Sequence, residues 1–149
     1  MSSCLSGKVK IFLLTLTIGM SMELASAQSC PLRLDGVEAA KLSSEGWLFG
    51  KSPTEISNLQ GLAINEGPLN DAEKIGDGYL LKPQFVNGVN IWLFPKKVGG
   101  NEVWMRCVYS DGVVANRRLS ATVSKCVERL AGRDAKGNQL LASAGCFEK

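Results

Sequence analysis

Short apolar segments alternate with turn-forming pairs along most of this chain. Each pair joins glycine to an acidic residue, an asparagine or a second glycine: Asp35-Gly36, Glu45-Gly46, Glu66-Gly67, Asp77-Gly78, Asn87-Gly88, Gly99-Gly100, Asp111-Gly112 and Gly137-Asn138. This spacing favours antiparallel strands, because parallel strands need long crossover connections. The pattern predicts a mainly β fold, an antiparallel meander or small sandwich, with one or two short helical segments.

Two apolar segments in this pattern are predicted to be strands. Residues 59–65 (LQGLAIN) end at a Glu-Gly-Pro turn, and residues 89–94 (VNIWLF) end at a proline, which cannot donate to a sheet. Because 89–94 is apolar on both faces, we expect a central strand that is covered on both sides and buries Trp92. Trp47 is also expected in the core. Residues 70–75 (NDAEKI) are predicted to form one helical turn.

The apolar segments on either side of the Ser-Asp-Gly turn at 110–112 are predicted to form a hairpin. A two-residue loop would place Arg106 directly opposite Arg117, and like charges across a strand pair are destabilising. A three-residue loop, with its glycine in the left-handed conformation, avoids this clash and sets Trp104 opposite Arg118. That register would allow a cation–π contact of about 0.5–1 kcal/mol between Trp104 and Arg118.

Residues 123–130 (VSKCVERL) fit two kinds of element. Their apolar side chains recur at i, i+3, i+4 and i+7, which matches one face of a helix, whereas the alternation typical of a strand is poorer. However, Cys126 and Cys146 lie symmetrically about Lys136, next to a Gly-Asn turn. A hairpin centred there would place the two cysteines opposite each other, so the sequence leaves helix and strand open.

Residues 1–27 have the features of a cleaved signal peptide. Two lysines precede the apolar run 11–20, and an Ala-Ser-Ala sequence ends at Ala27, as signal peptidase requires. The run is shorter than the roughly 20 apolar residues of a transmembrane helix. We therefore expect cleavage after Ala27, export to the periplasm, no transmembrane segment in the mature chain, and one mature domain over residues 28–149.

The remaining cysteines are predicted to form disulfides. Removal of the signal peptide takes away one of five cysteines and leaves Cys30, Cys107, Cys126 and Cys146. An even number of cysteines in an exported chain indicates a disulfide-stapled fold. Three pairings are possible, and the hairpin favours Cys126 with Cys146, which leaves Cys30 with Cys107. The chain-entropy relation assigns these two loops roughly 3.3 and 4.5 kcal/mol of stabilisation, respectively.

Catalytic chemistry has few candidates in this sequence. The chain contains no histidine, the commonest general base and a frequent metal ligand. Without an imidazole, Cys107 has no evident base to activate it as a nucleophile. Glu66 and Asp71 could meet in a cleft, as the carboxylates of a glycosidase do, although solvated loop acids are the simpler interpretation. We therefore predict a protein without enzymatic activity, catalytic residues, metal or cofactor.

The charge of the chain is mildly basic. The net charge of +3 falls to +2 when residues 1–27, with two lysines and one glutamate, are removed. That is too little for a nucleic-acid-binding protein. Trp104, Arg106, Arg117 and Arg118 are predicted to form a basic, aromatic binding face, with Trp104 partly exposed. Its partner would be an anionic envelope component or a protein, and the alternative is a solvated face with interspersed acids.

Several short motifs occur in a characteristic order. They are Cys30-Pro31, Gly46-Trp47, Gly67-Pro68, Leu81-Lys82-Pro83, an apolar strand around Trp92, W-x-x-C-x-Y from Trp104 to Tyr109, and a final pair of cysteines. Together they resemble an uncharacterised family of small exported proteins from Gram-negative bacteria, over nearly the whole mature chain. The resemblance implies a periplasmic, disulfide-bonded, mainly β domain, and it supplies no activity or functional residue.

A looser similarity is to the small periplasmic inhibitors of lysozyme, which are also disulfide-bonded β domains with an aromatic residue next to a cysteine. Only Ser110-Asp111-Gly112 stands in for their serine- and glycine-bearing inhibitory loop. A basic chain would also be repelled by a basic lysozyme. The sequence thus predicts a non-catalytic binding or accessory protein of the cell envelope, with an inhibitor of a wall-degrading enzyme as the alternative.

Overall fold

A computed structural model describes residues 27–67, 79–94 and 102–149. The expected signal peptide, apart from Ala27, and the helical turn predicted at 70–75 lie outside these residues. In the described part of the chain, eleven strands form two sheets, and every strand pair is antiparallel. The predicted fold class, a mainly β antiparallel architecture with short helical segments, is confirmed.

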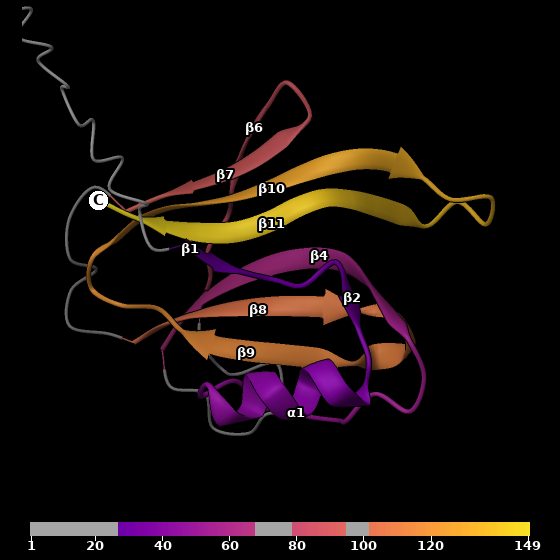
Figure 1. Cartoon of the computed structure of the whole chain (residues 1–149). Helices are drawn as coiled ribbons and strands as arrows, with labels where there is room; N and C mark the ends of the chain where they lie inside the picture. Colours follow the sequence, from indigo (N-terminus) through magenta and orange to yellow (C-terminus); the bar gives the residue numbers. More distant parts are fainter. Residues whose placement is uncertain (1–26, 68–78, 95–101) are drawn as a thin grey trace, which may run out of the picture.

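The strands divide into a sheet A and a sheet B. Sheet A consists of β1 (Ala27–Ser29), β6 (Gln84–Val86), β7 (Val89–Leu93), β10 (Val123–Arg133) and β11 (Gln139–Glu148). Sheet B consists of β2 (Arg33–Leu34), β3 (Leu48–Phe49), β4 (Ser57–Glu66), β5 (Tyr79–Leu80), β8 (Val103–Tyr109) and β9 (Val114–Arg118). The spatial orders are β1-β11-β10-β7-β6 and β2-β4-β8-β9-β3, with β5 on β4. Figure 1 shows sheet A above sheet B.

One α-helix, α1 (Gly36–Ser44), lies along the lower side of sheet B, next to β9 (Figure 1). It begins at Asp35, whose Oδ1 accepts hydrogen bonds of 2.9 Å from the amides of Val37 and Glu38. This is an N-cap, which satisfies amides that have no partner within the helix. Ala39 and Leu42, three residues apart, turn towards the core. The Asp-Gly pair that suggested a turn therefore starts a helix.

The β8–β9 hairpin has the predicted three-residue loop. The short 3-10 helix η1 (Ser110–Gly112) connects the strands, and the amide of Tyr109 donates to the carbonyl of Val113 at 2.9 Å. Gly112 has a φ of 72°, the left-handed conformation expected of it. Trp104 lies opposite Arg118, as predicted.

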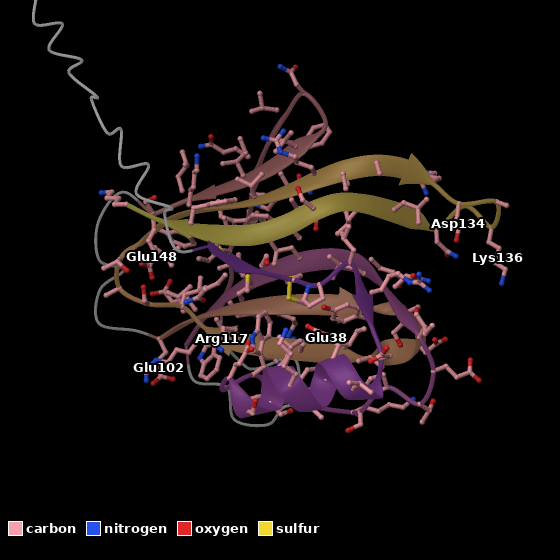
Figure 2. All side chains as sticks on the ribbon, in the orientation of Figure 1. Glu38, Glu102, Arg117, Asp134, Lys136 and Glu148 are labelled. Atoms are coloured by element: carbon pink, nitrogen blue, oxygen red, sulfur yellow. A yellow bond between two sulfur atoms is a disulfide. The ribbon has the colours of Figure 1, made fainter. Side chains whose placement is uncertain are left out.

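Residues 123–130 belong to a strand, which decides the alternative that the sequence left open. β10 pairs with β11 on one side and with β7 on the other. The pairing register shifts between Val123 and Lys125, so that Val123 and Cys126 are both buried although they are three residues apart. This β-bulge explains the helix-like spacing of the apolar residues. The hairpin turns around Lys136, at the far end of sheet A (Figure 2).

β7 is an internal strand, because it lies between β10 and β6. Trp92 is 5 % exposed, and its indole Nε1 donates to the carbonyl of Leu81 at 2.8 Å. However, Leu93 on the opposite face is 57 % exposed. The expectation that both faces of this strand would be covered was therefore wrong, because nothing in the described residues packs over that side of sheet A.

A single core lies between the two sheets and α1. Buried side chains of sheet A, such as Trp92 and Cys126, belong to the same cluster as Met105 of sheet B, Leu42 of α1 and Trp47. Trp47 is 5 % exposed, as expected for a core tryptophan. The described elements thus share one hydrophobic core.

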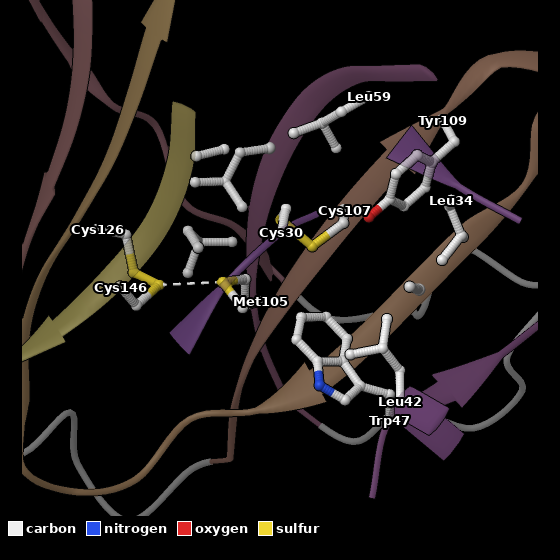
Figure 3. Close-up of a cluster of buried hydrophobic side chains, with 14 of the residues drawn as sticks. Cys30, Leu34, Leu42, Trp47, Leu59, Met105, Cys107, Tyr109, Cys126 and Cys146 are labelled. Atoms are coloured by element: carbon white, nitrogen blue, oxygen red, sulfur yellow. Dashed lines mark hydrogen bonds between the residues drawn. A yellow bond between two sulfur atoms is a disulfide. The ribbon is translucent and has the colours of Figure 1, made fainter. Parts of the chain in front are cut away.

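Both predicted disulfides are present, as Figure 3 shows. Cys30–Cys107 ties the segment after β1 to β8, and Cys126–Cys146 joins β10 to β11. Sγ of Cys146 lies 3.4 Å from Sδ of Met105, so the second disulfide packs directly against sheet B. Together the two bonds fix both sheets around the core.

Tyr109 offers a simple test of this core. Its side chain is 1 % exposed and its hydroxyl has no hydrogen-bond partner. Burial, reinforced by the charge of Glu38, raises the pKa of this hydroxyl well above its usual value. Because an unsatisfied buried hydroxyl is costly, we expect Tyr109→Phe to stabilise the protein by about 1 kcal/mol in urea unfolding. A clear loss of stability would mean that the hydroxyl has a partner.

Candidate functional site

The predicted basic face of sheet B contains three of its four expected residues. Trp104 pairs with Arg118 and is two residues from Arg106, so these three side chains share one face. Arg117 pairs with Met105, which is fully buried in the core. Arg117 therefore lies on the opposite face of the sheet, and the structure does not bring it together with the others.

Arg106 is buried. Its side chain is 6 % exposed, and its Nε donates a hydrogen bond of 2.9 Å to Oδ1 of Asn116. Burial lowers the pKa of the guanidinium, because desolvation disfavours the charged form. Asn116 is itself fully buried and donates through Nδ2 to the carbonyl of Leu48 at 3.4 Å. Arg106 thus belongs to the packed interior of this region rather than to an accessible surface.

Arg117 supports the end of α1. Its guanidinium lies 5.8 Å from the centre of the Trp47 ring and donates a hydrogen bond to the carbonyl of Glu45, the residue that caps the helix. Figure 2 shows Arg117 at this position between sheet B and α1. A cation is favourable at a helix C-terminus, where carbonyl groups point outwards. The contacts of Arg117 are therefore explained by the fold.

Arg118 is exposed but has an acidic neighbour. Its guanidinium forms an ion pair of 3.0 Å with Glu102. Trp104 is half-buried, and its Nε1 has no hydrogen-bond partner. Among the described residues, cation–π contacts join Arg117 to Trp47 and Lys125 to Phe147, so the predicted contact between Trp104 and Arg118 is not formed.

The other sequence candidates are also accounted for in part. Glu66 is half-buried at the end of β4, whereas Asp71 lies outside the described residues, so both the solvated loop acids that the sequence favoured and the alternative of a shared cleft are untested. The Ser110 hydroxyl accepts a hydrogen bond of 3.0 Å from the amide of Asn58. It therefore holds the η1 turn against β4. Cys107, the candidate nucleophile, is fully buried in a disulfide.

The outer face of sheet A is a surface that the sequence did not single out. Because Cys126 and Cys146 point into the core, the alternate residues of their strands point outwards. On β10 these residues are Lys125, Val127 and Arg129. Their cross-strand neighbours are Phe147, Gly145 and Ser143 on β11 and Leu93, Ile91 and Val89 on β7.

A hollow of about 360 Å³ opens on this face. Its lining combines two cations, two hydroxyls and apolar surface, and comprises Ser29, Lys125, Val127, Arg129, Ser143, Ala144, Gly145 and Phe147. Gly145 has no side chain where β1 runs past β11: a Cβ there would lie 2.9 Å from the carbonyl oxygen of Gln28. The glycine thus lets β1 approach closely and places the Ser29 hydroxyl at the hollow.

The charged side chains that point outwards from sheet A, among the described residues, are basic. Lys125 and Arg129 are exposed, and Nζ of Lys125 lies 5.7 Å from the centre of the Phe147 ring. Of the acids on the same strands, Glu128 is buried on the core side and Glu148 is hydrogen-bonded to Ser120 at 2.7 Å. In the described part of the chain, no acidic residue occupies an outward position on β1, β6, β7, β10 or β11. An anionic partner would therefore meet attraction without local repulsion.

The sequence carried a signal for this face. Lys125, Val127 and Arg129 are spaced at i, i+2 and i+4, which puts them on one side of a strand. On a helix, Lys125 and Arg129 would share one face and Val127 would point away from it. Since the sequence left helix and strand open here, the face could not be assembled before the strand was known.

No helix in the described ranges has the length and apolar character of a membrane span. Three or more potential metal ligands do not come together anywhere in those same ranges. No protein-family model, curated protein or solved structure matches this chain.

Proposed function

We propose that this chain is an exported, non-catalytic binding protein of the cell envelope, and that the outer face of sheet A is its binding surface. The partner is anionic. One observation carries the proposal: Lys125 and Arg129 stand beside exposed apolar side chains on an uncovered face with no acidic side chain among its described residues. Two disulfides around a common core are compatible with an exported protein.

The outer face of sheet A supports this role better than the Trp104 face of sheet B. On sheet B, Arg106 is buried and Arg118 is paired with Glu102. On sheet A, both cations are exposed and both line the hollow. Exposed apolar surface next to unpaired cations is typical of an interaction site.

Charge reversal on this face is expected to weaken binding to a polyanion. We expect the variant Lys125→Glu/Arg129→Glu to bind immobilised dextran sulfate at least about tenfold more weakly than the wild type at moderate salt, because each basic residue near an anionic surface contributes about 1 kcal/mol. Retention of the wild type should also fall as the salt concentration rises. Elution in a salt gradient measures both effects.

Two variants serve as controls for this experiment. Lys41→Glu changes an exposed cation on α1, far from the outer face of sheet A, and should cost less than half as much retention as the double variant. Arg118→Glu tests the face of sheet B that the sequence suggested. If only Arg118→Glu reduced retention, the binding surface would lie on sheet B. If none of the variants differed from the wild type, the proposed function would lose its support.

A further inference from the structure

We infer that the anionic partner is a phosphate-bearing lipid surface. The β6–β7 hairpin enters the boundary between headgroups and acyl chains, while Lys125 and Arg129 hold lipid phosphates. This inference rests on the proposed function, since it uses the same face and names its partner.

The β6–β7 hairpin exposes apolar side chains on both of its faces. Val86 pairs with Val89 on the outer face and is 49 % exposed, whereas Phe85 is directed to the other face and is 64 % exposed. Figure 1 shows this hairpin projecting from the top of sheet A, and Figure 2 shows its side chains standing out around it. A folded protein partner would cover one face of such a tip. A lipid medium surrounds both faces, so the arrangement favours lipid.

The distance between the apolar tip and the cations suits a bilayer boundary. Neighbouring strands lie about 4.8 Å apart, so the cations of β10 are about 5 Å from β7 and about 10 Å from β6. Apolar faces of interfacial proteins are buried by a similar depth, about 5–10 Å, below the headgroups. When Phe85 and Val86 reach the acyl boundary, Lys125 and Arg129 are therefore at the level of the phosphates.

The hollow supplies the groups that a phosphate requires. Lys125 and Arg129 are four residues apart on one strand, a span of about 13 Å. The hydroxyls of Ser29 and Ser143 line the hollow with them. Guanidinium, ammonium and hydroxyl groups all donate to phosphate oxygens, and the charged donors form the stronger bonds. Lys125 and Arg129, which line the hollow, lie on the same face of sheet A as the exposed Leu93. One lipid surface would therefore contact both the hollow and this apolar side chain.

Vesicle co-sedimentation tests the inference with the oxidised protein. One set of vesicles contains phosphatidylcholine alone, and the other contains equal parts of phosphatidylcholine and phosphatidylglycerol. We expect binding to the mixed vesicles to exceed binding to the neutral ones. Lys125→Glu/Arg129→Glu should weaken it by about 25-fold or more, a factor of about 5 for each basic residue. Phe85→Ser/Val86→Ser should weaken it by about tenfold or more, because both side chains would bury apolar surface in the lipid.

The control for the apolar pair is Val37→Ser, which removes an 81 % exposed valine from α1 and should bind the vesicles like the wild type. Far-UV circular dichroism and the thermal midpoint confirm that each variant is folded. Equal binding by the wild type and both double variants would overturn the inference, and so would the absence of binding to mixed vesicles. In that case, retention on dextran sulfate that still depends on Lys125 and Arg129 would leave the proposed function standing, with an acidic protein or glycan as partner. Binding that inorganic phosphate abolishes while Phe85→Ser/Val86→Ser has no effect would also overturn it, in favour of free phosphate as the ligand.

Discussion

Replacing Cys30 and Cys107 together by alanine is expected to lower the free energy of unfolding by about 4 kcal/mol, the largest effect of any change considered for this protein. The two cysteines are separated by 77 positions, so their bond closes a long loop in the unfolded chain. The chain-entropy relation assigns that closure roughly 4.5 kcal/mol. Since the net stability of a domain is about 5–15 kcal/mol, the variant should retain only part of it or be unfolded at 37 °C.

The physical basis of this effect lies in the connection between the sheets. Cys30 follows β1 of sheet A, and its amide donates to the carbonyl of Ala144 on β11 at 2.9 Å. Cys107 is in the centre of β8 in sheet B and is fully buried. The bond therefore ties the N-terminal segment of one sheet to the middle of the other. Without this bond, Cys30 and Cys107 can move apart in the unfolded chain, which gains conformational entropy and is therefore favoured over the folded state.

Urea unfolding followed by tryptophan fluorescence measures the loss in the free energy of unfolding. The matched control is Cys126→Ala/Cys146→Ala, which removes the second disulfide with its separation of 20 positions and should cost less, about 3 kcal/mol. A larger cost for the shorter loop would contradict the chain-entropy argument. It would indicate that the packing of Cys146 against Met105 contributes more than loop closure does.

Glu128→Ala is expected to destabilise the protein by about 3 kcal/mol, the largest effect of any single substitution considered, because it leaves a buried amide without an acceptor. Glu128 is 4 % exposed. Its Oε2 accepts from the amide of Leu62 at 2.5 Å, and its Oε1 accepts from Nδ2 of Asn90 at 2.8 Å. Leu62 lies on β4 between the positions that pair with β2 and with β5. The carboxylate thus completes an edge of sheet B from a strand of sheet A.

Two variants separate the hydrogen bond from the volume of the side chain. Glu128→Gln keeps nearly the same volume and one oxygen acceptor, so we expect a loss of only about 1 kcal/mol. Glu38→Ala removes a partly exposed carboxylate from α1 and should change stability by less than about 0.5 kcal/mol. Hydrogen exchange at the Leu62 amide should accelerate in Glu128→Ala. Unchanged protection of that amide would show that the bond contributes little.

The sequence predicted the fold class and much of the local structure for identifiable reasons. The three-residue loop at residues 110–112 followed from the repulsion between Arg106 and Arg117 in the competing register. The pairing of Cys126 with Cys146 followed from their symmetry about Lys136. In each case the decisive interaction is between residues close in the chain, where spacing and charge are sufficient.

The candidate site was less predictable because it depends on which side of each strand is covered. Trp104, Arg106 and Arg118 were placed correctly on one face, but the sequence does not tell that Arg106 would be buried against Asn116. The face of Lys125 and Arg129 needed both the strand assignment of β10 and the knowledge that nothing among the described residues covers it. Which face of each sheet is buried depends on how the two sheets pack against each other.

By itself, the sequence determined the antiparallel strand architecture and the turn at residues 110–112, and it favoured one of three disulfide pairings, because alternation, glycine and cysteine spacing act over short distances along the chain. The tertiary structure alone decided that residues 123–130 pair as a strand with β11 and β7, that Glu128 joins sheet A to β4, and that the outer face of sheet A stays open among the described residues. These features depend on contacts between strands that are far apart in the chain, and a local pattern carries no information about which of them will pack together.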